Sequence, residues 1–195
     1  MEFVETGYEI GEEYTTYGGF IKNKKSDKAI TNFTLEIELL DENGNVLETS
    51  IQNINFLMQD QTRAFGGDVY YSSKDPKVAS VNFKAVGGTS AKAFKDEYLV
   101  PEDFEVKDLK QGNQGNSSII IGTAVNKTDK QSQLLDVVLL TRKDGKIVAG
   151  ARTMLRNIAP KGEYTFQTTL FHNSPLEGVE VLLYDDITKS GEYGF

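Results

Sequence analysis

The fold class of this 195-residue chain is decided by the stretch Phe33-Thr34-Leu35-Glu36-Ile37-Glu38-Leu39-Leu40-Asp41-Glu42-Asn43-Gly44-Asn45-Val46. Apolar and polar side chains alternate from Phe33 to Leu39, and a period of two predicts a β-strand with one buried and one solvated face. Asn43-Gly44 then predicts a hairpin turn, because both residue types tolerate a positive φ. Short strands and turns follow one another along the chain, and no segment carries a sustained helical stripe. The sequence therefore predicts an all-β fold of antiparallel sheets.

The order of strands and turns occurs twice. The turn at Gly44 has a counterpart at Gly145, 101 positions later, and Phe65 falls on Phe166 at the same offset. The stretch from Gly19 to Lys24 falls on the one from Gly122 to Lys127 at an offset of 103, so short insertions or deletions flank that strand. A repeat of this length is near the roughly 100 residues of a small sandwich domain. We predict two tandem Ig-like (fibronectin-III-like) antiparallel β-sandwiches.

Turn-forming residues place the boundary between the two copies. Gly87-Gly88-Thr89-Ser90 closes the first copy, and Pro101-Glu102-Asp103 opens the second. We expect a first sandwich at residues 1–90, a linker at 91–101 and a second sandwich at 102–195. Between residues 91 and 99, Phe94 and Tyr98 are four positions apart, so the segment can form either a short helix or an extended linker.

Composition excludes several functions. The net charge of −8 argues against binding to nucleic acid or to anionic membranes, both of which need cationic side chains. No apolar run approaches the roughly 20 residues that a membrane-spanning helix needs. With no cysteine and one histidine, thiol chemistry and most metal sites are excluded, and we expect no cofactor. We also expect no metal at Asp41–Glu48, because that turn lacks the glycine and glutamate spacing of a calcium loop. Its Asp and Asn residues are instead typical of a hairpin turn.

Catalytic groups are few. Asp185-Asp186 and Glu12-Glu13 are adjacent pairs, and neighbours on a strand point to opposite faces. His172 is expected at a partly exposed strand end and not in a catalytic triad with Ser174. We therefore expect no enzymatic activity.

The stretch Ile37–Val46 resembles the signature of the FxLYD domain, an apolar residue, x, Leu, an apolar residue, Asp and then Asn-Gly. Gly19–Lys24 is similar to that family's strand ending in Asn, and Pro160–Phe166 to its loop before an aromatic strand. The second copy departs from the signature, with Thr141-Arg142 where Asp is expected. Surface-layer-associated repeats of Gram-positive bacteria are a rival match. Either resemblance implies an Ig-like sandwich of the bacterial cell envelope without catalysis.

These observations together favour a non-enzymatic, extracytoplasmic binding or spacer module, on the cell surface or secreted, with an envelope protein or a glycan as partner. The alternative is a carbohydrate-binding accessory module of an envelope enzyme. Residues 1–5 have neither the basic start nor the apolar core of a signal peptide. We favour a trimmed leader over a cytoplasmic protein, because a cysteine-free, acidic tandem sandwich suits an exposed surface.

Two groups of side chains are candidates for ligand binding. Tyr14, Tyr17 and Tyr71 are the candidates for stacking on a sugar, although strand alternation buries about half of the rings in this tyrosine-rich copy. Arg142, Arg152 and Arg156 fall on or beside one hairpin of the second copy, where an anionic partner would dock.

The strand at Leu134–Leu140 breaks the pattern of the first copy. At the 101-residue offset Asp136 would point into the core, while Leu135, Val137 and Leu139 would form an outward apolar stripe that marks an interdomain or partner interface. A register shift of one residue would instead place those three side chains in the core. We favour the shift, because it removes a buried charge without invoking a partner.

Overall fold

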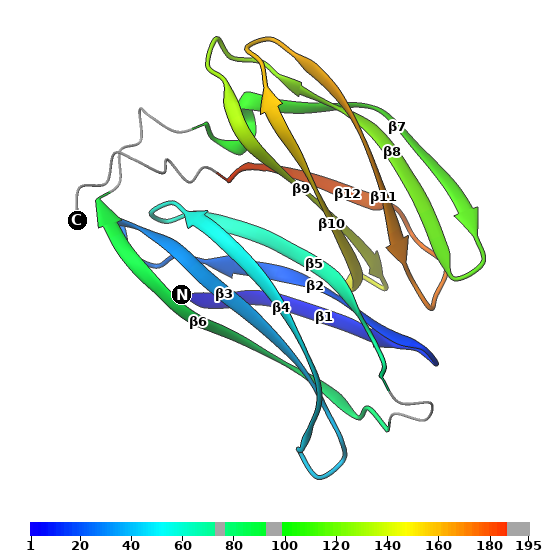
Figure 1. Ribbon diagram of the computed structural model, residues 1–195. Coiled ribbons are helices and arrows are strands. Elements are labelled where there is room, and N and C mark those ends of the chain that lie inside the picture. The colour runs from blue at the N-terminus through cyan, green and yellow to red at the C-terminus, as the bar shows by residue number, and fades with distance from the viewer. Residues whose placement is uncertain (73–76, 93–98, 187–195) are drawn as a thin grey trace.

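The computed structural model describes residues 1–72, 77–92 and 99–186. Within these ranges the chain is built from strands and one short 3-10 helix, which confirms the predicted all-β class (Figure 1). The first half holds six strands: β1 (Glu2–Ile10), β2 (Tyr14–Lys22), β3 (Lys28–Leu40), β4 (Val46–Leu57), β5 (Thr62–Tyr70) and β6 (Ser80–Lys92). The second half holds η2 (Pro101–Asp103), β7 (Phe104–Gln114), β8 (Ser117–Asn126), β9 (Ser132–Lys143), β10 (Lys146–Ile158), β11 (Glu163–Phe171) and β12 (Val179–Asp185).

The sheet topology is duplicated, as the sequence repeat predicts. The first half forms the antiparallel sheets β1-β2-β5 and β4-β3-β6, and the second half forms β7-β8-β11 and β10-β9-β12 in the same order. No sheet of the described residues mixes strands of the two halves. The molecule is thus a tandem of two β-sandwiches.

Equivalent residues make equivalent contacts in both halves. Asn23 and Asn126, at the ends of β2 and β8, are buried, and each donates from its side-chain amide to backbone carbonyls of the following loop and of the next hairpin. A Cβ added to Gly19 would come within 2.7 Å of the Phe65 ring, and one added to Gly122 within 2.6 Å of the Phe166 ring. Both features maintain the same strand geometry, which explains why these positions recur in the sequence.

Each half has its own apolar core between its two sheets. The first core gathers side chains of β2, β3, β4 and β5, with Phe33, Phe65 and Ile37 almost completely buried. The second gathers side chains of β7 to β12, including Phe166 and Leu139. Burial of these side chains is the main term that stabilises each sandwich.

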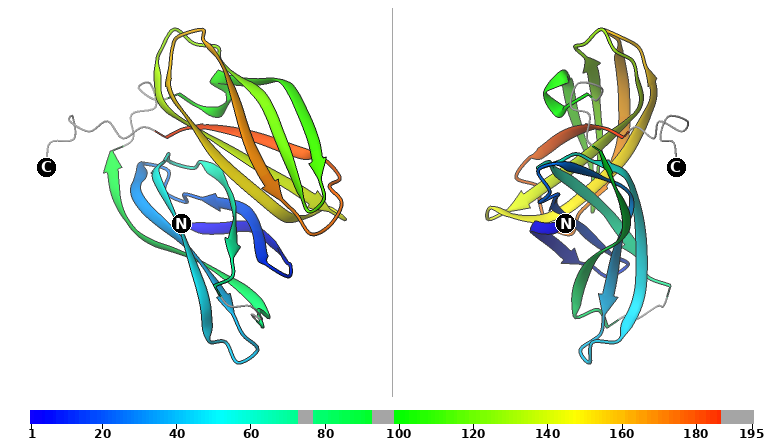
Figure 2. Two further views of the ribbon diagram at one scale, coloured as in Figure 1. Left: turned by 45° about the vertical axis from the view of Figure 1, so that its right-hand side comes forward. Right: turned by 90° about the vertical axis from the view of Figure 1, so that its left-hand side faces the viewer.

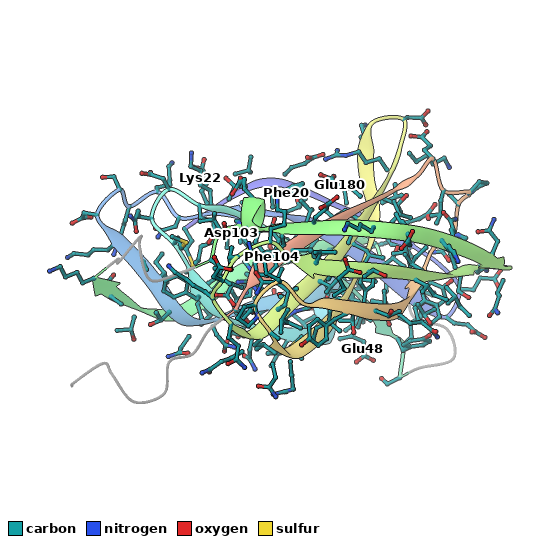
Figure 3. All side chains as sticks on the ribbon, turned by 90° about the horizontal axis from the view of Figure 1, so that it is seen from above. Phe20, Lys22, Glu48, Asp103, Phe104 and Glu180 are labelled. Carbon is teal, nitrogen blue, oxygen red and sulfur yellow. The ribbon has the colours of Figure 1, made fainter. Side chains whose placement is uncertain are left out.

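The two sandwiches pack against each other, so that four sheets lie in layers. The sheet β1-β2-β5 of the first half faces β10-β9-β12 of the second, with β10 lying against β1, β2 and β5. The first half, coloured blue to green, lies below the second in Figure 1 and keeps that place in both turned views of Figure 2. A third apolar cluster fills this junction, formed by Ala64, Val138, Leu140, Ile147 and Tyr184 with Phe20, which is labelled in Figure 3.

The close approach of the sheets depends on glycine. A Cβ added to Gly66 of β5 would lie 2.8 Å from Cα of Gly150 in β10, and one added to Gly150 would lie 2.8 Å from the Tyr17 carbonyl oxygen. Real Cβ atoms do not come this close to backbone, so a side chain at either position would force the sheets apart.

The register question at β9 is resolved by the second core. Leu135, Val137 and Leu139 are fully buried in it, opposite β8 and β11, so the interface alternative for these three residues is wrong. The register-shift alternative is confirmed, because the three side chains lie in the core. The reason for favouring it was wrong, because Asp136 is buried on the other face of β9 and the shift does not remove a buried charge. The opposite face of β9, which carries Asp136, Val138 and Leu140, is the one covered by the first half.

The predicted linker begins later than expected. Ala91 and Lys92 are the last residues of β6 and pair with Ala29 and Lys28 of β3. The possible helix between residues 91 and 99 falls mostly on residues 93–98, which lie outside the described residues. The domain limits themselves stay a prediction.

Candidate functional site

A buried network of four charged side chains joins the two halves. Arg63 of β5 is fully buried and donates from Nη2 to Oδ2 of Asp136 at 2.6 Å and from Nη1 to Oδ1 of Asp186 at 2.8 Å. Arg152 of β10 contacts the same two carboxylates, through Nε to Asp136 Oδ1 at 2.5 Å and through Nη2 to Asp186 Oδ2 at 3.5 Å. Two cations and two anions therefore alternate, and their charges cancel.

Further contacts secure Arg63 in this network. Its Nη1 also donates to the Phe56 carbonyl oxygen at 2.9 Å, and its guanidinium carbon lies 5.1 Å from the centre of the Tyr184 ring. Burial acts to lower the pKa of Arg63, but Asp136 and Asp186 outweigh it and hold that pKa above its ordinary value. Arg63 therefore stays charged in the closed junction, which ties β5 to β9 and to the end of β12.

Beside this network lies a groove with a volume of about 430 Å³. We name it the junction groove. Its lining residues come from both halves: Tyr17, Ile51, Gln52, Asn53, Asn55 and Gly66 from the first, and Leu134, Arg152, Met154 and Arg156 from the second. Because Arg152, Met154 and Arg156 are two residues apart on β10, strand alternation places them on one face, turned toward the first half.

The walls of the junction groove combine apolar and polar groups. Ile51 of β4 is 64% exposed and Met154 of β10 is 46% exposed, so the groove presents two large apolar side chains to solvent. Arg156 is also exposed, whereas Arg152 is neutralised by the buried carboxylates and donates to the Asn53 carbonyl oxygen at 3.0 Å. Arg156 is thus the cation of the groove that lies outside the buried network.

Gln52 is the side chain that marks the junction groove as a site. It is only 7% exposed, and neither its Nε2 nor its Oε1 has a hydrogen-bond partner in the protein. A buried polar group without a partner costs about 1–3 kcal/mol, so such groups are rare in native structures. A ligand group that both accepts and donates a hydrogen bond would recover this cost.

A second hollow lies on β9 and the loop before β12, with a volume of about 360 Å³. Among its lining residues the cation Arg142 is already paired with Glu5, and Glu177 and Glu180 bring negative charge. This hollow offers fewer uncommitted groups than the junction groove.

The predicted tyrosine platform does not form. Tyr14 and Tyr17 are both buried: Tyr17 packs in the core of the first half, whereas the Tyr14 ring packs against Phe171 of the second half. The Tyr14 hydroxyl donates to the Asn116 carbonyl oxygen at 2.9 Å across the junction, and burial raises the pKa of the Tyr17 phenol. The half-buried Tyr71 shares a hydrogen bond of 2.7 Å with the Thr15 hydroxyl. Only Tyr17 lines the groove, and none of the three offers a free ring face for stacking.

The three predicted arginines are separated by the fold. Arg142 forms a double hydrogen bond with the Glu5 carboxylate across the junction, at 2.5 and 2.9 Å, and these bonds hold the pKa of Glu5 below its ordinary value. Arg152 belongs to the buried network and Arg156 to the open part of the junction groove. An anionic partner would therefore meet Arg156 and not the whole set.

The other sequence candidates have structural roles. His172 is buried, contrary to expectation: its Nδ1 lies 2.9 Å from the Ser174 carbonyl oxygen and its Nε2 lies 3.0 Å from the hydroxyl of the fully buried Ser118. Asp41 accepts hydrogen bonds from the backbone of Asn43 and Asn45, each at 2.8 Å, as the hairpin interpretation requires. Among the described residues no group of three or more His, Asp and Glu side chains is placed to hold a metal ion. No helix in those ranges is long and apolar enough to cross a membrane.

Sequence reasoning missed Arg63 and Gln52. Both lie in strands next to apolar residues, where alternation would have flagged an inward polar side chain, as it did for Asp136. Arg63 was the missing partner that the Asp136 argument called for.

No protein-family model matches this chain, and no curated protein matches it. Among solved structures, the chain is similar to the N-terminal tandem of the modules CBM22-1 and CBM22-2 from Paenibacillus barcinonensis Xyn10C. The alignment covers 97% of this chain and 86% of that chain, at 11% identity and a TM-score of 0.19. A likeness this distant carries no argument about fold or ligand. The resemblances to FxLYD domains and to surface-layer-associated repeats therefore stay predictions.

Proposed function

We propose that this protein is a non-enzymatic binding module of a bacterial cell envelope, placed outside the cytoplasm, and that the junction groove is its binding site. The observation that carries the proposal is the buried, unpaired amide of Gln52 in the groove wall. The exposed side chains of Ile51 and Met154 add apolar surface, and Arg156 adds a positive charge. Such a mixture of apolar walls and a few polar groups is typical of binding sites.

A binding role without catalysis fits the described side chains. The single histidine has both ring nitrogens engaged in buried hydrogen bonds, so it is not free to act as a base toward a ligand. The buried network of Arg63, Asp136, Asp186 and Arg152 holds both walls of the groove at a fixed spacing. A preformed site of this kind binds without the cost of ordering its own walls.

The test is sedimentation of the full chain with insoluble cell walls purified from a Gram-positive bacterium. We expect the protein to sediment with the walls, and Met154→Asp to weaken this binding at least about tenfold, since a charge would replace apolar contact area. The matched control is Leu109→Asp on β7, because Leu109 is 44% exposed but does not line the groove. Absence of sedimentation, or equal loss in both variants, would overturn the proposal.

A further inference from the structure

We propose that the junction groove takes an extended peptide segment as an added strand on the outer edge of β4, with a carboxylate of that peptide bound by Arg156. The inference deepens the binding function proposed above and rests on it. Its starting observation is that β4 forms one edge of the sheet β4-β3-β6, and that its 12 residues contain one charged side chain, Glu48.

Edge strands normally carry features that prevent pairing with another chain, such as charges, bulges, short length or a cover. In the described residues the other edges have them. β1 carries three charged residues and β7 carries four, and the pairing of β7 with β8 is interrupted between Lys107 and Lys110. β6 carries two lysines and has two glycines at positive φ. β5 and β11 lie against β10, β12 has only seven residues, and β10 carries lysine and arginine side chains. From Glu48 to Gln52, β4 lacks such protection and presents Ile51 outward.

The backbone of β4 shows where an added strand would pair. The Asn53 carbonyl oxygen accepts a hydrogen bond from Arg152, so it points away from β3. In an antiparallel ladder the N–H and C=O of one residue point to the same side, and alternate residues share that side. Ile51 therefore also directs its N–H and C=O outward. The added strand would therefore form hydrogen bonds with the backbone of Ile51. It would end at Asn53, because the Asn53 carbonyl oxygen already accepts a hydrogen bond from Arg152.

The chemistry at that end specifies the terminal group of the peptide. Arg156 lies in the same groove as Asn53 and provides the positive charge that a carboxylate needs. The unpaired amide of Gln52 offers one donor and one acceptor, which a peptide group matches with its own C=O and N–H. Ile51 and Met154 supply apolar contacts for alternate side chains of the strand. Tyr14, Tyr17 and Tyr71 provide no free ring to stack on a sugar, so the peptide fits this groove better than a glycan.

The first experiment uses a synthetic peptide of alternating threonine and valine that ends in a glutamate with a free carboxyl terminus. We expect titration calorimetry with the full chain to detect binding, and we expect an amidated peptide ending in glutamine to bind about tenfold more weakly. Amide hydrogen exchange followed by NMR should slow at the Ile51 N–H when the peptide is bound. No binding of the acidic peptide by the folded protein would overturn the inference.

Variants of the protein test the geometry. Ile51→Pro removes the outward N–H and should abolish binding of the acidic peptide, whereas Ile51→Ala keeps the N–H and should weaken binding only a few-fold. Proline is tolerated at edge positions whose N–H faces solvent. Arg156→Glu should weaken binding at least about tenfold, and Lys146→Glu, an exposed site on the same strand, should not. The comparison of Arg156→Glu with Lys146→Glu tests peptide binding at the groove even if Ile51→Pro fails to fold.

Other occupants give different results. Binding of an N-acetylglucosamine tetramer at Met154 and Gln52, without binding of the peptide, would overturn the peptide inference while leaving the binding function intact. A dimer in sedimentation velocity that Ile51→Pro converts to a monomer would overturn it as well, because a second copy of β4 would then be the partner. Loss of cell-wall binding in the control Leu109→Asp would count against the proposed function and leave the peptide result unaffected.

Discussion

Replacing Asp136 by asparagine tests the buried charge network at the junction. The side chains of Arg63 and Asp136 are each 1% exposed, and Asp136 contacts both Arg63 and Arg152 at 2.6 and 2.5 Å. Asp136→Asn keeps the shape of the side chain but leaves two arginines to share the single carboxylate of Asp186.

The magnitude follows from the burial. Removing one partner of a buried ion pair costs about 3–5 kcal/mol, because the remaining charge is left unpaired away from water. Since Asp186 still neutralises one arginine and the asparagine oxygen still accepts a hydrogen bond, we expect the lower end, a loss of about 3 kcal/mol in the free energy of unfolding. For a chain of 195 residues this corresponds to a fall in Tm of about 6–12 °C. Urea denaturation followed by circular dichroism measures the first quantity, and a thermal scan measures the second.

The matched control is Asp129→Asn. Asp129 is 92% exposed and lies 3.7 Å from the Lys161 ammonium, so its replacement should change stability by less than about 0.5 kcal/mol. In addition, Asp136→Asn and Arg152→Met should be non-additive, because both remove the same contact. A loss below about 1 kcal/mol for Asp136→Asn, or strict additivity of the two changes, would refute the reasoning about the network.

Three further predictions concern other parts of the structure. Burial raises the pKa of Asp185 from 3.8 to about 6, so the folded chain binds this proton more tightly than the unfolded chain, and the contribution of Asp185 to stability falls as the pH rises from about 4 to about 6. The free energy of unfolding of Asp185→Asn, measured relative to the wild type, should therefore be up to about 2–3 kcal/mol more favourable to the variant at pH 7.5 than at pH 4. Urea denaturation of both proteins at both pH values measures this, and an equal difference at the two pH values would contradict it. Val137→Lys should lose more than about 3 kcal/mol, because Val137 is fully buried in the second core, and unchanged stability would place it outside that core. Gly66→Val should open the junction, because its Cβ would lie 2.8 Å from Gly150 Cα; small-angle scattering should show a larger radius of gyration than for Gly112→Val on β7, where an added Cβ meets no atom within 4 Å, and identical curves would show that the sheets adapt.

The sequence alone determined the local structure and its duplication. Alternation from Phe33 to Leu39 and the turn at Asn43-Gly44 correspond to β3, its hairpin and β4, because both signals depend on neighbours in the chain. The repeated pairs Gly19 with Phe65 and Gly122 with Phe166 were visible as an offset before their contact was known. These features are set within one sandwich, where a period of two distinguishes the buried face from the other face.

Only the tertiary structure decided what covers that other face. β9 is apolar on both sides, at Leu135 and Val137 on one and at Val138 and Leu140 on the other, and alternation cannot tell which side meets its own sandwich and which meets the neighbouring one. Alternation likewise could not show that Tyr14 meets the second half, where its ring packs against Phe171. The partner of Asp136 is Arg63, 73 residues earlier in the chain, and the junction groove exists only where β4 and β10 lie together. The physical reason is that the cost of burying a charge or an amide is settled by distant groups, which the local pattern of the sequence does not specify.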